Sequence, residues 1–251
     1  TSNLRLGVNA GNSIASGGNY NVVVGDEAGT ALTTGDNNVA VGYAALDANQ
    51  TANHNVAIGG SALGSNTTGA TNTAVGGESM TANTEGGNNV ALGYQSLHDL
   101  TTGSNNVAIG YQALSTEDAH GDNVAVGYQS LKTLNAGADA FNTAVGYQSG
   151  QAVTTGLRNT LIGGLAGDAL TDADYNTSLG FGSLGFDQLG SRTTAIGYRA
   201  LGTQRFTSAT DSYNTAVGYD AGLEITTGVR NTFIGGLAGD ALTTGLDNVA
   251  M

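Results

Sequence analysis

The sequence contains no cysteine, no proline and no tryptophan among its 251 residues. The lack of cysteine excludes a disulfide scaffold, thiol catalysis and metal sites with cysteine ligands. The lack of proline fits a chain in which every backbone N–H is needed as a hydrogen-bond donor to a neighbouring segment.

Cations and long apolar runs are also scarce. Seven Lys and Arg residues stand against 20 Asp and Glu residues, giving a formal net charge of -13. Such a chain has too few cations to cover a phosphate backbone, so we expect no nucleic-acid partner. No apolar run reaches the roughly 20 residues that cross a bilayer, so we expect no membrane insertion by this segment.

Glycine, by contrast, occurs 41 times, and much of it belongs to a repeat. The string Asn-(Val/Thr)-Ala-(Val/Ile/Leu)-Gly recurs along the whole chain, mostly with a period of 17 residues. We call its glycines the motif glycines: Gly7, Gly25, Gly42, Gly59, Gly76, Gly93, Gly110, Gly127, Gly146, Gly163, Gly180, Gly197, Gly218 and Gly235.

An asparagine stands four residues before almost every motif glycine. If each repeat stacks on the next, these side chains form an amide ladder that satisfies its own polar groups and fixes the register. The predicted ladder consists of Asn38, Asn55, Asn72, Asn89, Asn106, Asn123, Asn142, Asn159, Asn176, Asn214 and Asn231. The side chains around it alternate as in a strand. We predict Val or Thr and the aliphatic residue on the core face, and Asn, Ala and Gly on a narrow opposite face.

Seventeen residues are too few for a repeat of two helices, and the segments alternate as strands do. We therefore predict one all-β domain over residues 1–251, a parallel β-solenoid of about 14 coils with one coil per 17-residue repeat. Recurrent Thr-Thr-Gly triplets are predicted to form corners in which glycine supplies a positive φ. Their glycines are Gly35, Gly69, Gly103, Gly156, Gly228 and Gly245.

Two further columns of the repeat compensate for each other. The residue four after the motif glycine is Leu or Met in eight coils and Gly in six, and in all six glycine coils an aliphatic residue follows three positions later. Leu46 with Asn49 and Gly29 with Leu32 are examples of the two classes. The pattern predicts that two corner geometries fill one core pocket from different backbone positions.

Two other solenoid classes do not fit the spacing. Hexapeptide helices need an aliphatic residue every sixth position, whereas the core spacing here is five. Calcium-binding nonapeptide rolls need a Gly-Gly-x-Gly-x-Asp signature, which no coil carries. Asp168, Asp172 and Asp174 form a single acidic loop, which is either solvated or able to hold a calcium ion.

Asn106–Gly110, Asn-Val-Ala-Ile-Gly, resembles the Ser-Val-Ala-Ile-Gly core of the head repeats of YadA-like trimeric autotransporter adhesins. The longer run over residues 105–114, with Thr-Thr-Gly between coils, is similar to repeats of tail-fibre-type proteins of phages and marine bacteria. The resemblance covers nearly the full chain, although the coil is longer than the usual adhesin repeat. It implies a side-by-side homotrimer of left-handed β-rolls, extracellular, on a bacterial cell surface or a phage virion, and used for attachment.

Residue patterns favour association as well. Each coil offers only about three sizeable core side chains, and its Ala/Ser/Gly face permits close packing of chains. A monomeric solenoid is the alternative. Because both ends stop within a repeat, we expect the chain to be a segment of a longer fibre.

No catalytic or cofactor-binding arrangement is evident. His54, His98 and His120 fall in different columns, several coils apart, so we predict no metal cluster, no hydrolase triad and no cofactor. We therefore expect a protein that is not an enzyme.

One column suggests recognition of a ligand. Five residues before the motif glycine, aromatic and arginine residues alternate on successive coils: Phe141, Arg158, Tyr175, Arg192, Tyr213 and Arg230. They form either a structural ladder or a glycan-binding stripe, because aromatic faces and guanidinium groups suit sugar rings and acidic glycans. Arg205 and Phe206, in the longest insertion, are further ligand-binding candidates. Tyrosines directly after the motif glycines are expected to pack against a neighbouring coil or chain.

We accordingly expect a non-enzymatic extracellular fibre or adhesin segment that attaches to a host-surface glycan or protein receptor. Two alternatives stay open. One is a structural filament subunit that polymerises end to end. The other is an ice-binding solenoid, suggested by the Thr-Thr corners, although these corners leave gaps that an ice-binding face does not tolerate.

Overall fold

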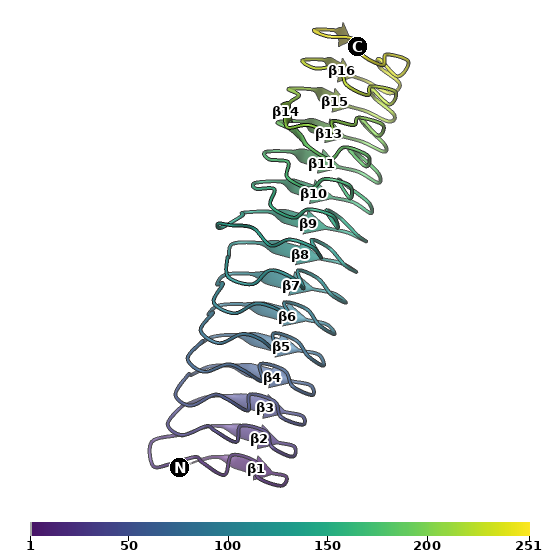
Figure 1. The fold of residues 1–251 in the computed structure, drawn as a ribbon. Coiled ribbons are helices and arrows are strands. Elements are labelled where there is room, and N and C mark those ends of the chain that lie inside the picture. The colour runs from purple at the N-terminus through teal and green to yellow at the C-terminus, as the bar shows by residue number, and fades with distance from the viewer. Residues whose placement is uncertain (1) are drawn as a thin grey trace. The chain divides into compact units, whose positions relative to one another are not determined.

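The computed structural model describes residues 2–251, which contain 17 β-strands and no helix. The chain divides into two compact units, the first ending at Asp122 and the second covering Asn123–Met251. In each unit, short strands are joined by tight turns and stack coil upon coil (Figure 1).

The strands of the first unit pair in parallel, each with the next along the chain. They are β1 (Leu4–Leu6), β2 (Val22–Val24), β3 (Val39–Val41), β4 (Val56–Ile58), β5 (Thr73–Val75), β6 (Val90–Leu92) and β7 (Val107–Ile109). Paired residues lie one repeat apart, as in Val39 with Val56 and Ala40 with Ala57. The predicted all-β parallel solenoid with a period of about 17 residues is therefore confirmed for this unit.

The second unit is built from the same coil. Its strands are β8 (Val124–Val126), β9 (Thr143–Val145), β10 (Thr160–Ile162), β11 (Thr177–Leu179), β12 (Gly190–Ser191), β13 (Thr194–Ile196), β14 (Thr210–Asp211), β15 (Thr215–Val217), β16 (Thr232–Ile234) and β17 (Val249–Ala250). The longest coil keeps the register, because Thr194 pairs with Thr215. Its extra residues lie at a corner, where β12 and β14 form a separate parallel pair.

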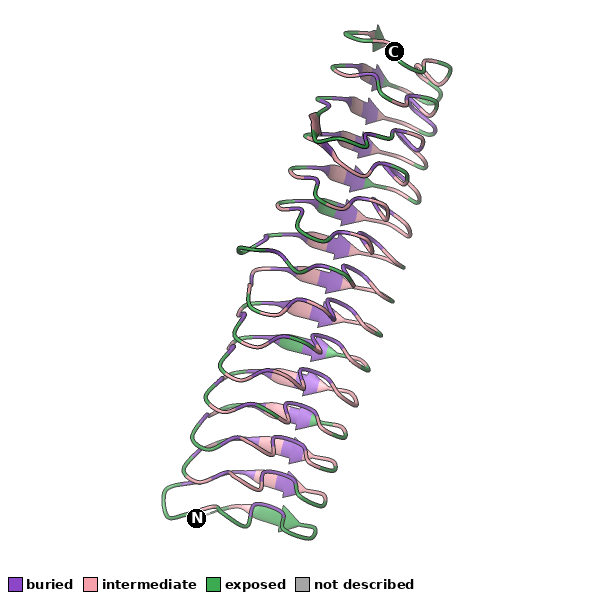
Figure 2. Cartoon of the chain, in the orientation of Figure 1, coloured by how far each residue is buried: buried purple, intermediate pink, exposed green. Residues whose placement is uncertain are grey.

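The face of the strands that the alternation had assigned to the outside is the buried face. In β3, Ala40 is 1% exposed, whereas Val39 and Val41 are only partly covered. The same burial pattern recurs along both units (Figure 2). The predicted face assignment is therefore wrong: Asn and Ala line the interior, and Val or Thr faces outward with the aliphatic residue. The interior has little width left opposite the strand, because buried leucines such as Leu46 and Leu63 fill it.

The Ala or Ser three residues after the motif glycine is also interior. Ala45, Ala62 and Ser79 have no exposed surface. The small-residue face that was expected to allow close packing of chains is therefore part of the core of each coil.

Glycine is required at two places in the coil, for different reasons. The motif glycine Gly42 has a φ of +134°, and a Cβ there would stand 2.6 Å from the Gly59 carbonyl oxygen in the next coil. In the Thr-Thr-Gly corners the prediction of a positive φ is wrong, since Gly69 and its equivalents do not have one. A Cβ on Gly69 would instead clash with the Gly86 carbonyl oxygen and lie 2.5 Å from Asn66 Oδ1.

The compensating columns fill one pocket, but the backbone at this corner has one geometry in both classes of coil. Leu46 and Gly29 occupy equivalent positions and have nearly the same φ, +53° and +55°. The prediction of two corner geometries is therefore wrong. In the glycine coils the space is filled by other side chains, since a Cβ on Gly167 would stand 2.9 Å from both Leu170 Cδ1 and Leu161 Cδ2.

Candidate functional site

The ladder asparagines join consecutive coils through bonds from side chain to backbone. Asn55 Oδ1 accepts from the N–H of Asn72 at 2.9 Å, and Asn55 Nδ2 donates to the Gly69 carbonyl at 2.9 Å. In the second unit, Asn142 Oδ1 accepts from the N–H of Asn159 at 2.8 Å. The buried members are Asn38, Asn55, Asn72, Asn89, Asn106, Asn123, Asn142, Asn159, Asn176, Asn214 and Asn231.

The one threonine in this column is supported by the longest insertion. The N–H of Thr193 still donates to Asn176 Oδ1 at 2.9 Å. Gln204, from the insertion, donates through Nε2 to Thr193 Oγ1 at 3.2 Å and accepts at Oε1 from Asn214 Nδ2 at 2.8 Å. A glutamine amide thus replaces the missing asparagine amide in this coil.

A second buried polar column lies seven residues after the motif glycine. Asn66 Nδ2 donates to Asn49 Oδ1 at 3.3 Å, and Asn83 Nδ2 donates to Asn66 Oδ1 at 2.8 Å. Sequence reasoning did not place these amides in the core. The sequence contained a signal for their burial, because aliphatic residues occupy the same column in other coils and mark it as interior.

Asp187 is the fully buried carboxylate of this column in the second unit. Its Oδ1 accepts from the backbone N–H of Phe206 at 2.9 Å, and its Oδ2 accepts from Gln204 Nε2 at 2.6 Å. Burial raises the pKa of Asp187, while these hydrogen bonds oppose the shift. The hydrogen bonds tie the insertion to the coil before it, so the role of Asp187 is structural.

Four of the six alternating aromatic and arginine residues form a continuous stack. The Arg158 guanidinium carbon lies 5.9 Å from the centre of the Phe141 ring and 5.5 Å from that of Tyr175. Arg192 lies 5.1 Å from the Tyr175 ring on a neighbouring coil. Arg158 Nη1 also donates to the Tyr175 hydroxyl at 2.9 Å. The arginines of the stack therefore have aromatic partners on neighbouring coils, and the two rings remain about half exposed.

The rest of this column is paired with acids. Arg192 Nη1 lies 2.5 Å from Asp211 Oδ1, and the Tyr213 hydroxyl lies 3.5 Å from Asp211 Oδ2. Arg230 binds both carboxylate oxygens of Asp247, at 2.6 and 2.8 Å, and holds the pKa of Asp247 below its usual value. These arginines already have partners, which favours the structural interpretation of the column.

The two insertion candidates have different environments. Phe206 is 5% exposed and packs over Gly190, where an added Cβ would stand 2.8 Å from its ring. The prediction of Phe206 as a ligand-binding residue is therefore wrong, because the ring is part of the core. Arg205 is exposed and lines a surface hollow with Phe186.

The tyrosines after the motif glycines form exposed stacks along each unit. Tyr94 also donates through its hydroxyl to Glu78 Oε2 at 3.2 Å, which raises the pKa of Tyr94. The stacked pairs are Tyr94–Tyr111, Tyr128–Tyr147, Phe181–Tyr198 and Tyr198–Tyr219, with ring centroids 5.8, 5.4, 6.0 and 5.2 Å apart. Packing of these rings against neighbouring coils is as expected.

Among residues 2–251, one group of three metal-ligating side chains lies close together. Ligand atoms of Glu117, Asp118 and His120 are all within 4.8 Å of one another. His120 Nδ1 is 3.5 Å from Oε1 of the buried Glu117 carboxylate. Sequence reasoning compared the histidines only with one another and missed this group, whose signal was the Glu-Asp-x-His order. The set could hold a metal ion. Without one, Glu117 Oε1 accepts from the backbone N–H of His120 at 3.2 Å, and the buried His120 Nδ1 has no hydrogen-bond partner.

The acidic loop of the second unit accepts hydrogen bonds from the preceding coil. Asp172 Oδ1 accepts from Thr155 Oγ1 at 2.7 Å, and Asp174 Oδ1 accepts from the N–H of Leu157 at 2.7 Å. Asp168 is half-buried, and burial raises its pKa. Two of the three carboxylates are thus engaged with the preceding coil.

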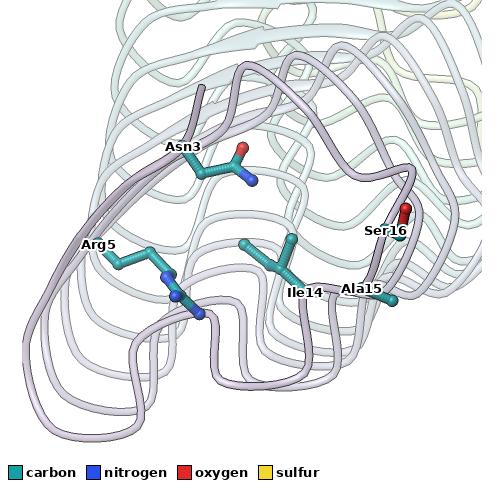
Figure 3. Close-up of a pocket in the computed structure, with 5 residues that line it drawn as sticks. All are labelled: Asn3, Arg5, Ile14, Ala15 and Ser16. Atoms are coloured by element: carbon teal, nitrogen blue, oxygen red, sulfur yellow. The ribbon is translucent and has the colours of Figure 1, made fainter. Parts of the chain in front are cut away.

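A hollow of about 520 Å³ lies at the open side of the first coil, between Asn3, Arg5, Ile14, Ala15 and Ser16 (Figure 3). In the residues that are described, no further coil covers this side. The hollow is therefore the uncovered interior of a coil rather than a cleft with its own walls.

Within the described part of the chain, no helix is long and apolar enough to cross a bilayer. No family model, no curated protein and no solved structure matches the sequence or the fold.

Proposed function

We propose that the chain is a segment of a non-enzymatic extracellular attachment fibre, in which three copies of a left-handed solenoid lie side by side and join through the outward faces of their strands. The observation that carries the proposal is this outward face. In the first unit it leaves Ile58, Val90 and Leu92 exposed by 38%, 37% and 46%.

This face is uniformly uncharged. The outer positions of β2 to β7 and of β8 to β11 hold only Val, Thr, Ile and Leu. Soluble monomers rarely leave a continuous apolar strip of this kind uncovered, whereas association surfaces have this composition. The acidic residues of the chain lie elsewhere in the coil, where their charge keeps separate fibres apart.

A second copy of the chain is the partner that fits this face best. A parallel neighbour has the same coil spacing, so its aliphatic side chains meet those of the first chain in every coil. Three such faces around one axis enclose an apolar interior with no face left over. The resemblance of the repeats to trimeric adhesin heads and tail fibres also supports three chains in the assembly. It supports a location on a bacterial surface or a virion as well.

A charge on the outward face tests the proposal. Leu92→Glu should lower the native mass to that of a single chain and leave the circular dichroism spectrum of the coils unchanged. Thr34→Glu, on an exposed corner, is the matched control and should keep the native mass. If both variants keep the mass of the unmodified protein, the strand face is not the interface. Attachment is then tested as binding of the assembled protein, compared with Leu92→Glu, to bacterial or host cells.

Ice binding remains a second candidate because of one column in the second unit. The first strand position there is threonine in six successive coils, Thr143, Thr160, Thr177, Thr194, Thr215 and Thr232. The corner threonines are less suitable, since Thr67 Oγ1 already donates to the Thr84 carbonyl at 3.0 Å. Thermal hysteresis in a monomeric protein would favour this function, because a trimer would cover the same face.

A further inference from the structure

Departures from the repeat concentrate around one exposed aromatic ring. Phe186 is 64% exposed and stands six residues after its motif glycine. The flanking coils have Ala169 and Thr203 at this position. No other coil of the sequence has an aromatic residue there. An exposed phenylalanine added to a regular coil is of no use to the packing of that coil.

Phe186 lines a hollow of about 190 Å³ together with Asp168, Phe181 and Arg199. Phe181 is 52% exposed, so two exposed aromatic rings border this hollow. The Asp168 carboxylate supplies hydrogen-bond acceptors, and the Arg199 guanidinium supplies donors.

Glycines open this hollow. Gly182 is the only glycine at its position in the repeat, where four successive coils carry glutamine. A Cβ on Gly185 would stand 3.5 Å from Asp168 Oδ1, so even a small side chain there would narrow the approach to the carboxylate. Gly202 continues the gap in the next coil.

Phe186 also lines a second hollow of about 390 Å³, together with Thr203, Arg205 and Thr226. No carboxylate lines it. Both threonine hydroxyls donate to backbone carbonyls of other coils, Thr203 to Leu223 and Thr226 to Thr243, so their oxygens remain as acceptors. Among the described residues that line this hollow, Arg205 alone is charged.

The two arginines differ from the others of the second unit. Arg192 and Arg230 form ion pairs with Asp211 and Asp247, and Arg158 lies against two aromatic rings and donates to the Tyr175 hydroxyl. Within residues 2–251, the guanidinium groups of Arg199 and Arg205 have neither an ion pair nor a hydrogen bond. In a chain with a formal net charge of -13, two unpaired guanidinium groups beside one exposed ring are unexpected unless an anion joins them.

We propose that the surface around Phe186 binds an acidic oligosaccharide. The Arg205 guanidinium binds the sugar carboxylate with two parallel hydrogen bonds, and the Phe186 ring stacks on the apolar face of a pyranose. A neighbouring neutral sugar lies in the smaller hollow, where its hydroxyls donate to Asp168 and accept from Arg199. This inference rests on the proposed attachment function, for which it names the ligand class and the place.

The repeat itself supplies variants that the coil tolerates. Phe186→Ala introduces the residue of the flanking coil at Ala169, and Arg199→Gln introduces the residue that four other coils carry. Arg205→Gln removes the second free charge. Arg230→Gln is the matched control, because it removes one positive charge from an exposed site elsewhere in the same unit.

The experiment titrates 3′-sialyllactose and, as the neutral control, lactose into the native assembly of each variant, with binding followed by saturation-transfer NMR. We expect sialyllactose to bind the unmodified protein more tightly than lactose. Phe186→Ala and Arg205→Gln should weaken sialyllactose binding at least tenfold. Arg199→Gln should weaken the binding of both sialyllactose and lactose, and Arg230→Gln should change the binding of neither.

Three results would overturn the inference. Sialyllactose and a uronic-acid disaccharide could both fail to bind, the Phe186 and Arg205 variants could bind as the unmodified protein does, or Phe186→Ala could change the native mass and so identify the ring as a contact between chains. Native mass and cell attachment are measured separately. A trimer that attaches to cells without binding acidic sugars ends this inference and leaves the proposed fibre function standing.

Discussion

Asn55 Oδ1 accepts a hydrogen bond from the backbone N–H of Asn72, 2.9 Å away in the next coil, and both asparagines are fully buried. The bond is made by a side chain, yet it serves the same purpose as a rung between strands. Because the same bond recurs along each unit, the register of each unit is fixed by side chains as well as by backbone pairing.

Removal of one amide should therefore weaken a coil without a change in its apolar packing. Asn55→Ala leaves the buried N–H of Asn72 without its acceptor, whereas the Gly69 carbonyl keeps a second donor in Asn66. We expect a loss of about 1–3 kcal/mol in stability, measured by denaturant unfolding. The control is His54→Asn at the neighbouring exposed position, where a φ of +61° suits asparagine and no loss is expected. Equal losses in the two variants would contradict a special role for the buried amide.

Two glycines of different columns should respond in opposite ways to an added methyl group. Gly69→Ala should cost about 1–3 kcal/mol, because its Cβ meets backbone oxygen in the next coil. Gly60→Ala should be neutral or stabilise by up to about 1 kcal/mol, since no atom lies within 4 Å of the added group. Thermal unfolding of the two variants checks this. A Gly69 variant as stable as the unmodified protein would show that the corner can open.

The shared core pocket predicts rescue by a second substitution. Leu46→Gly should destabilise the first unit by about 2–5 kcal/mol, because Leu46 is fully buried and leaves a cavity. Adding Asn49→Leu recreates the combination of Gly29 and Leu32 in the preceding coil and should restore at least half of the loss. Denaturant unfolding of the single and double variants measures the recovery. If the double variant is no more stable than Leu46→Gly, the two columns do not share a pocket.

Buried Asp187 predicts a definite sign of pH dependence. Burial raises its folded-state pKa above the unfolded value of about 4. The folded state then binds more protons in this window, so the contribution of Asp187 to stability falls as the pH rises through its folded pKa. Relative to Asp187→Asn, the unmodified protein should gain in thermal midpoint as the pH is lowered from 7 towards 4. A relative loss over that range would mean that the hydrogen bonds outweigh burial.

The coil itself could be predicted from the sequence because its period is regular. The 17-residue spacing, the alternation around residues such as Ala40 and the buried asparagine column all belong to local pattern and stacking. Absence of proline was informative for the same reason, since the N–H groups of each coil, such as that of Val39, donate to the next coil.

The direction of the strand faces could not be predicted in the same way. Alternation shows which residues share a face, but hydrophobicity alone assigned Val39 and Val41 to the core, where Ala40 lies instead. The choice depends on the width of the coil interior, which is set by leucines and amides from distant positions in the repeat. The Phe186 surface was missed because it depends on side chains absent from three glycines in neighbouring coils.

The native mass of the purified chain tests the central claim most directly. Multi-angle light scattering of the protein as it elutes from a sizing column should give three times the chain mass of 24.9 kDa, independent of concentration over a tenfold dilution. A mass of one chain would contradict association through the outward strand faces, and a mass that grows with concentration would replace the trimer with an end-to-end filament.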